Sequence, residues 1–172
     1  MANQNSQIIT DLSANPPVKT NPQEIGGRLR VATETLLMTS GVSTDIKRFV
    51  PIPSRAVVLR VEIANDDLDS NATPTLATDV GLYRTTADGG AVVAAAFFAS
   101  AITQLRAPAE FTDVTYESGV VTVANRARRV WEQLGLTADP RVDYDVALTY
   151  TANAATHANG SVTIRVTYVL PE

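Results

Sequence analysis

Three polar side chains alternate along one stretch of the sequence in a pattern that suits a metal ion. Asp67, Asp69 and Asn71 match the first three ligand positions of a calcium-binding loop. The match then ends, because Ala72 stands where that loop needs glycine and Thr78 stands where it needs a bidentate glutamate. The pattern therefore favours a solvated loop, with weak cation binding as the alternative.

Residue counts exclude most other catalytic centres. His157 is the single histidine and the chain has no cysteine, which rules out a histidine-based triad, a multi-histidine zinc site and thiolate chemistry. We expect His157 to lie exposed in a polar turn. Four carboxylates could pair as acid and base across a sheet, but their spacing does not bring them together: Asp113, Glu117, Asp143 and Asp145. The sequence thus predicts no catalytic residue, no cofactor, no metal site and no enzyme.

Composition and charge are those of an ordinary globular protein. Of 172 residues 45% are hydrophobic, and the net charge of −4 with dispersed Lys and Arg argues against nucleic acid as a partner. The basic run Arg126–Arg129 is interpreted as the solvated face of a helix. No apolar run reaches the ~18 residues of a membrane span, so no membrane partner is expected. Because no secretory signal follows Met1, the chain is expected to remain in the cytoplasm where it is made.

Residues 1–27 differ from the rest and predict an extended N-terminal arm. They are rich in Asn, Gln, Ser and Pro, and the prolines exclude a long helix or a central strand. Fully extended at about 3.3 Å per residue, the arm would reach up to ~90 Å. A disordered terminus is the alternative. Scattered apolar side chains favour an arm that docks on a neighbouring subunit, and these are the candidate interface residues: Ile8, Ile9, Leu12, Val18 and Ile25.

Residues 28–172 predict a single β domain, because several segments alternate apolar and polar residues. Residues 28–38 place Leu29, Val31 and Leu37 on one face, which we expect to be buried, and residues 55–63 alternate in the same way. Pro51 and Pro53 are interpreted as punctuation before that second strand. A shorter strand is expected over 79–84.

The middle of the chain is less regular. Alanine favours helix, so residues 94–105 are predicted to form a short helix. Residues 112–116 and 120–123 flank Ser118-Gly119 and predict a hairpin. Asn125 is then expected to cap a helix that ends at Leu134, before Gly135.

The clearest alternation comes last, over 143–151 and 161–169. We expect these two strands to form a hairpin through the turn 152–160. About seven or eight strands with one or two short helices predict an all-β fold, a β-sandwich of jelly-roll type.

The order of these segments resembles a set of tailed-phage structural proteins whose members are capsid decoration (cement) or related head proteins. Six segments and one dipeptide carry the resemblance: Gly26–Val31, Val50–Arg60, Asp79–Tyr83, Phe97–Ala101, Val130–Leu136, Asp139-Pro140 and Tyr144–Leu148. It spans most of the chain, and its motifs are structural. The resemblance implies a structural virion protein on the capsid exterior, made in the host bacterial cytoplasm, that forms homotrimers.

The leading hypothesis is a decoration protein that binds the outside of a phage head and stabilises it, with the major capsid protein and further copies of itself as partners. The alternative is a head-fibre or tail protein of the same sandwich type that contacts host surface glycans through loops 65–75 and 152–160. Trp131 and the five tyrosines are the side chains that could stack on sugars, and Trp131 is better explained as a contact between helix and sheet. A polysaccharide-degrading enzyme is the third class.

Overall fold

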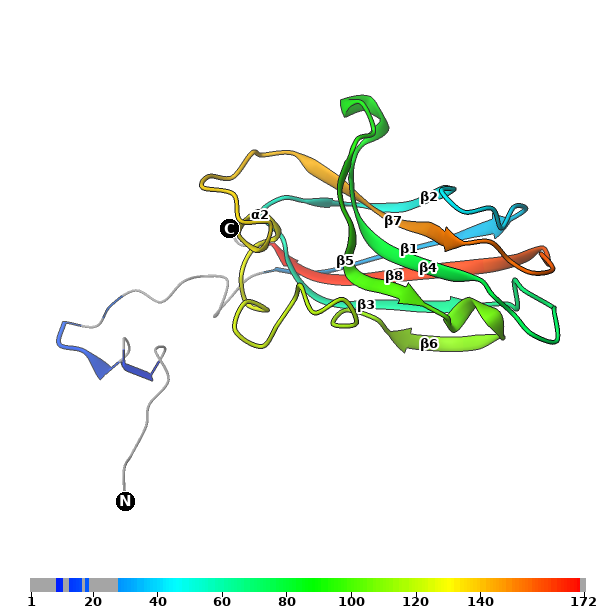
Figure 1. Cartoon of the computed structure of the whole chain (residues 1–172). Coiled ribbons are helices and arrows are strands. Elements are labelled where there is room, and N and C mark those ends of the chain that lie inside the picture. The colour runs from blue at the N-terminus through cyan, green and yellow to red at the C-terminus, as the bar shows by residue number, and fades with distance from the viewer. Residues whose placement is uncertain (1–8, 11–12, 17, 19–27, 171–172) are drawn as a thin grey trace, which may run out of the picture.

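The computed structural model describes residues 9–10, 13–16, 18 and 28–170. Residues 28–170 form two four-stranded sheets that pack face to face (Figure 1). The core between them is built from the inward-facing side chains of both sheets, among them Ile63, Leu82, Phe97, Leu148 and Ile164, all 0% exposed. The predicted all-β sandwich is confirmed.

The order of the strands defines the type of sandwich. Sheet I contains, in spatial order, β1 (Arg28–Met38), β8 (Gly160–Leu170), β3 (Val57–Asn65) and β6 (Ala109–Asp113). Sheet II contains β2 (Ile46–Pro53), β7 (Asp143–Ala152), β4 (Ala77–Arg84) and β5 (Val92–Ile102). Every pairing is antiparallel, and the orders 1-8-3-6 and 2-7-4-5 are those of an eight-stranded jelly roll.

Helical structure in residues 28–170 is limited to single turns. These are η1 (Thr86–Asp88), η2 (Gln104–Arg106) and α2 (Val130–Gln133). No helix among the described residues is long and apolar enough to cross a membrane.

The predicted hairpin between 143–151 and 161–169 is wrong, although both strands exist. They are β7 and β8, and they lie in opposite sheets. Each is an inner strand whose two edges are already occupied, β7 by β2 and β4, and β8 by β1 and β3. Alternation shows that a segment has two unlike faces, but it does not identify the strand that pairs with it.

The predicted helix over 94–105 is also wrong, because this segment forms most of β5. The strand bulges over β4: Val80 lies opposite Ala99, whereas Leu82 lies opposite Ala94, so β5 contributes three extra residues. The bulge fits because Gly81 has no side chain. A Cβ added there would lie 2.1 Å from the carbonyl oxygen of Ala94. Tertiary packing therefore overrides the helix propensity of alanine.

Residues 112–123 do not form the predicted hairpin. Strand β6 ends at Asp113, and the chain from there to α2 consists of turns. The predicted helix 125–134 is reduced to α2, because the Asn125 side chain caps a turn by accepting the Thr122 N–H at 2.6 Å. Gly135, with φ of 74°, ends the helix as expected.

Strand β2 was missed because it contains Pro51 and Pro53. Proline lacks the N–H that a central strand needs. In the structure β2 is an edge strand that pairs with β7 alone, so one side of its backbone needs no partner in the sheet.

The predicted burial of one face of β1 is reversed in the structure. Leu29, Val31 and Leu37 are 63%, 59% and 67% exposed. The opposite face of the strand turns toward the core, where Leu36 is half-buried and Met38 is fully buried. Both faces carry apolar residues at that end of the strand, so the sequence pattern could not show which face the second sheet covers.

This arrangement predicts that two leucine truncations differ sharply in their effect on stability. Leu82→Ala removes a side chain that is 0% exposed in β4 and should destabilise the fold by about 2–5 kcal/mol. Leu37→Ala, in β1, should change the free energy of unfolding of the isolated chain by roughly 0.5 kcal/mol or less. Urea unfolding followed by circular dichroism measures both. Equal losses would show that the outward face of β1 is in fact part of the core.

Candidate functional site

Two of the five predicted arm residues are described, and both are half exposed. Ile9 is 49% exposed and Val18 is 52% exposed. Ile8, Leu12 and Ile25 lie outside the described residues. The role of the arm as an interface therefore stays a prediction.

The outer face of sheet I carries large exposed apolar side chains. In addition to Leu29, Val31 and Leu37 on β1, it presents two large side chains from the other half of the sheet. A bulge in β3 between Val58 and Arg60 leaves Leu59 44% exposed, and Phe111 of β6 is 38% exposed. We call these five side chains the outer face of sheet I.

A row of paired charges crosses the middle of this face. Glu62 accepts a hydrogen bond from Arg165 Nε at 2.8 Å and one from Arg60 Nη1 at 3.5 Å. Arg60 Nε also donates to Asp113 at 3.2 Å. Two arginines and two carboxylates therefore neutralise one another, and the Arg165 guanidinium lies 3.9 Å from the ring centroid of Phe111.

Hydrogen bonds shift the pKa of two groups in this row, Asp113 and Arg165. Burial by itself raises the pKa of Asp113, but hydrogen bonds from Thr115 and Arg60 outweigh it and hold the pKa below its ordinary value. The hydrogen bond to Glu62 raises the pKa of Arg165. The face is thus neutral in sum and apolar at its margins, a character that suits contact with protein.

Loops 65–75 and 152–160 connect β3 to β4 and β7 to β8, and they meet at one end of the sandwich. Asp69 joins the two loops by hydrogen bonds. The carboxylate is 1% exposed and accepts four backbone N–H groups. Thr75, Leu76 and Ala155 donate to Oδ2 at 2.7, 3.0 and 3.0 Å, and Thr156 donates to Oδ1 at 2.9 Å. Burial tends to raise the pKa of Asp69, but these four hydrogen bonds outweigh it and hold the pKa well below 3.8.

The calcium-loop pattern is therefore used for backbone contacts. Asp67 accepts the Asp69 N–H at 2.9 Å, and Asn71 accepts the Thr73 N–H at 2.9 Å. No group of three His, Cys, Asp or Glu residues that could hold a metal ion occurs among the described residues. The alternation of polar residues serves to shape the loop.

His157 lies in the same junction and is half-buried, so its predicted exposure is wrong. It forms an isolated β-bridge with Asp69, and its Nε2 lies 3.2 Å from Asn159 Oδ1. Its Nδ1 faces Gly41, where an added Cβ would lie 2.7 Å away. The close backbone of Gly41 explains why this histidine packs against the loop.

The remaining candidates for chemistry are scattered. Asp113 belongs to sheet I, whereas Asp145 of sheet II pairs with Arg48 at 3.0 Å. In the basic run, Arg126 stacks over Tyr116 at 4.8 Å, and Arg129 precedes α2 as its N-cap. These side chains therefore stabilise separate parts of the fold.

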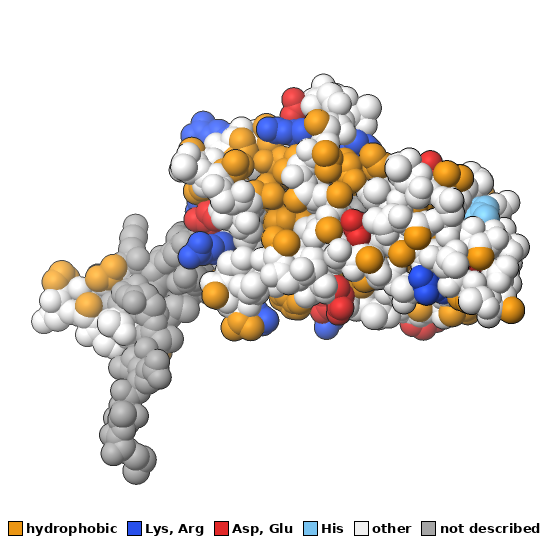
Figure 2. Space-filling view, viewed as in Figure 1, with side chains coloured by type: hydrophobic (Ala, Val, Ile, Leu, Met, Phe, Trp, Pro, Cys, Tyr) orange, Lys and Arg blue, Asp and Glu red, His pale blue; other side chains and the backbone are white. Residues whose placement is uncertain are grey.

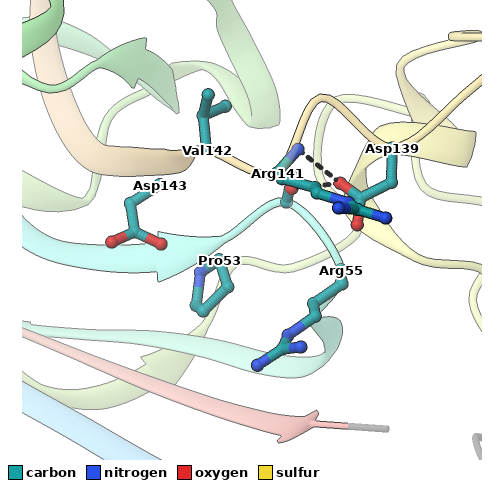
Figure 3. A pocket seen from close by; sticks show the side chains of 7 residues that line it. Pro53, Arg55, Asp139, Arg141, Val142 and Asp143 are labelled. Atoms are coloured by element: carbon teal, nitrogen blue, oxygen red, sulfur yellow. Dashed lines mark hydrogen bonds between the residues drawn. The ribbon is translucent and has the colours of Figure 1, made fainter.

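A cleft of about 500 Å³ lies where β2 ends and β7 begins, and Figure 3 shows the side chains that line it. Asp139 accepts the Ser54 hydroxyl at 2.5 Å and the Arg141 N–H at 2.9 Å. Arg55 and Asp143 line its rim. Burial tends to raise the pKa of Asp139, but these hydrogen bonds and nearby arginine charges outweigh it and lower the pKa.

The residues of this cleft hold the end of β2 against the segment before β7. Ser54 is 1% exposed and donates to a carboxylate of low pKa, which is a poor proton acceptor, so it lacks the base that a serine nucleophile needs. Helix α2 docks beside it, since the Trp131 N–H donates to the Ser54 carbonyl at 3.0 Å. Trp131 thus lies at the opposite end from loops 65–75 and 152–160, away from the surface proposed to stack on sugars.

Comparisons with known proteins point to a phage capsid. No protein-family model matches the sequence, and no curated protein matches it. The structure is similar to a chain in the capsid asymmetric unit of cyanophage Pam1, with a TM-score of 0.57 and 27% identity over 86% of this chain and 88% of that one. It is also similar to a chain in the capsid of Ralstonia phage GP4, with a TM-score of 0.63 and 20% identity over 90% and 92%.

The two likenesses carry different weight. At 20% identity the likeness to the Ralstonia phage chain shows the shared fold alone. The likeness to the Pam1 chain, at higher identity and over most of both chains, supports a phage structural protein related to the capsid.

The loop junction predicts a strong and pH-dependent effect of Asp69→Asn. An amide cannot accept all four N–H groups, so the variant should lose about 2–4 kcal/mol at neutral pH. Because the folded state holds the pKa of Asp69 below 3.8, the wild-type carboxylate stabilises the fold above that pH. Its contribution declines as the pH falls further, so the two proteins should converge in acid. Urea unfolding over a pH series measures the difference.

Asp67→Asn is the matched control. Asp67 accepts one N–H from within its own loop, so this variant should lose about 1 kcal/mol or less. Equal losses for the two variants, or a difference that does not change with pH, would contradict the role assigned to Asp69.

Proposed function

We propose that this protein is a capsid decoration protein that binds the outside of a phage head and stabilises it. The observation that carries the proposal is its likeness, over 86% of its length, to a chain of a phage capsid asymmetric unit. The protein acts through buried surface and not through catalysis. Its polar clusters at Asp69 and at Ser54 support this, because they hold loops together.

The exposed apolar surface supports a role in assembly. Three large side chains on one strand remain 59–67% exposed, although the core beneath them is complete. Burial of each such side chain stabilises a complex by ~1.5–3 kcal/mol. A homotrimer that presents three copies of the arm and of this face would convert weak single contacts into tight attachment to the major capsid protein.

The first test concerns assembly in solution. A stable homotrimer is expected, because the outer face of sheet I and the described arm residues Ile9 and Val18 are not buried within one chain. Size-exclusion chromatography with light scattering measures the mass directly. A monomer at micromolar concentration would count against the trimer.

The second test removes the arm. Deletion of residues 1–24 leaves every strand of the sandwich in place, so the β circular dichroism and most of the thermal stability should be kept. Attachment to capsids should weaken, because a loss of about 3 kcal/mol per subunit means a contact weaker by about a hundredfold. Co-sedimentation with undecorated capsids, followed by a heat or low-salt challenge of the particles, measures attachment and protection.

A shorter deletion is the control. Residues 2–7, Ala-Asn-Gln-Asn-Ser-Gln, carry no large apolar side chain, so their removal should leave attachment unchanged. Equal binding by the full-length chain and the 1–24 deletion would show that the sandwich, and not the arm, contacts the capsid. Failure of the full-length protein to bind heads would favour a fibre or tail protein.

A further inference from the structure

Strand β1 carries large apolar side chains on the face that points away from the core. Leu29, Val31 and Leu37 point away from the core, on the same side as Val169 and Thr167 of β8, which lie opposite Leu29 and Val31. The face that turns toward the second sheet carries exposed charges at Arg28, Arg30 and Glu34. The residues of this face that contact the core are Ala32, Leu36 and Met38. In an isolated chain this arrangement keeps the apolar face of β1 in water.

The edge of β1 is also long. Its 11 residues pair with β8 on one side, and among the described residues no strand pairs with the other side. Natural edge strands are usually short, bulged or covered, because free backbone groups recruit another chain. An apolar face beside an open edge is the surface to which an extended segment binds.

A second exposed apolar region provides a contrast. Figure 2 shows hydrophobic side chains gathered in the middle of the viewed face, on and beside β5. Val92 of β5 is 61% exposed, but the neighbouring Ala94–Ala96 are small and half-buried, and the strand is irregular where it crosses Gly81. This region lacks the regular strand edge that β1 offers.

The sequence next to β1 supplies a segment of the right chemistry. Residue 27 joins β1 directly, so the arm brings its five apolar residues within reach of this surface. In the single chain, however, Ile9, Val18 and Leu29 are all about half exposed or more. The described part of a chain's own arm therefore does not cover its own β1 face.

The spacing of the arm also opposes a hairpin with β1 of the same chain. A two-residue turn at Gly26-Gly27 would set residues opposite each other whose numbers add to 53. Glu24 would then face Leu29, and Pro22 would face Val31. The first pairing sets a charge beside an apolar side chain, and the second sets a residue without an N–H in the ladder.

We infer that the outer face of sheet I along β1 binds the N-terminal arm of a second copy of this chain. The inference rests on the proposed function and deepens it, because it names the surface and the partner that hold the copies together. Exchange of arms buries the apolar residues of the arm and of β1 at once. Removal of either should loosen the oligomer.

Disulfide trapping tests this directly, since the natural chain has no cysteine. One full-length copy carries Val18→Cys and a second copy, with a size tag, carries Val31→Cys. After mixing and mild oxidation, the expected product is a disulfide-linked heterodimer on a non-reducing gel. Val92→Cys is the matched control, because Val92 is 61% exposed against 59% for Val31 but lies in the other sheet.

Three results would overturn the inference. They are the absence of a heterodimer at high protein concentration, equal trapping by Val31→Cys and Val92→Cys, and trapping within one chain when a single copy carries both Val18→Cys and Val31→Cys. The experiment needs no capsid. If the disulfide forms but the protein does not attach to heads, the inference stands and the proposed function fails. If the protein attaches to heads but no disulfide forms, the proposed function stands and the inference fails.

A second experiment replaces the exposed apolar side chains of β1 and leaves the arm unchanged. The triple variant Leu29→Thr, Val31→Thr, Leu37→Thr retains residues that favour strands, so its circular dichroism should be unchanged. Light scattering should show loss of the oligomer. The double variant Ile46→Thr, Val92→Thr, on sheet II, should keep it, and an unchanged oligomer in the triple variant would contradict the inference.

Discussion

The pairing of β8 between β1 and β3 determines which side chains of sheet I face the core and which face outward. It joins the last strand of the chain to the first, and its register sets Leu29 opposite Val169 and Thr35 opposite Thr163, whose hydroxyls lie 2.9 Å apart. With this register Ile164 and Val166 complete the core, and the odd-numbered residues of β1 point outward. A shift by one residue would exchange the two faces. The same pairing therefore closes the core and creates the exposed apolar surface.

The roles of the polar and apolar residues in this protein differ from those that their types suggest. Asp69, His157 and the Ser54–Asp139 pair are the residues that most resemble parts of a reactive site. In the structure they lie where loops meet at the two ends of the sandwich. Asp69 accepts backbone N–H groups and Asp139 accepts the Ser54 hydroxyl. His157 places its Nε2 beside the Asn159 side chain. The apolar residues of β1 resemble core residues and lie on the surface. This division fits a phage structural protein related to the capsid.

The sequence predicts the fold class well and its connections poorly. Four strands follow from alternation, β1, β3, β7 and β8, and a fifth, β4, is predicted as a short strand over 79–84. Two errors have one cause, because each prediction used the type of a residue without its three-dimensional neighbours. Alanine predicted a helix in a segment that forms a bulged strand over Gly81. Proline was interpreted as a break in the chain although β2 is an edge strand that tolerates it. The partner of each strand depends on contacts between distant segments.

The candidate site was harder to predict for a related reason. Alternation in residues 28–38 is the same whether Leu29 and Val31 face the core or the solvent. One signal was present: Leu36 and Met38 give the other face its own apolar residues, so either face could have been the buried one. The exposed surface becomes visible only when β8 and the second sheet are in place.

We propose that this chain decorates the outside of a phage head. Cryo-electron microscopy of native particles tests it most directly, because the eight-stranded sandwich is recognisable in density. We expect this density on the outer surface of the head shell, in groups of copies whose β1 faces are covered. Density confined to the tail or to a fibre, or absence of the sandwich from the head surface, would contradict it.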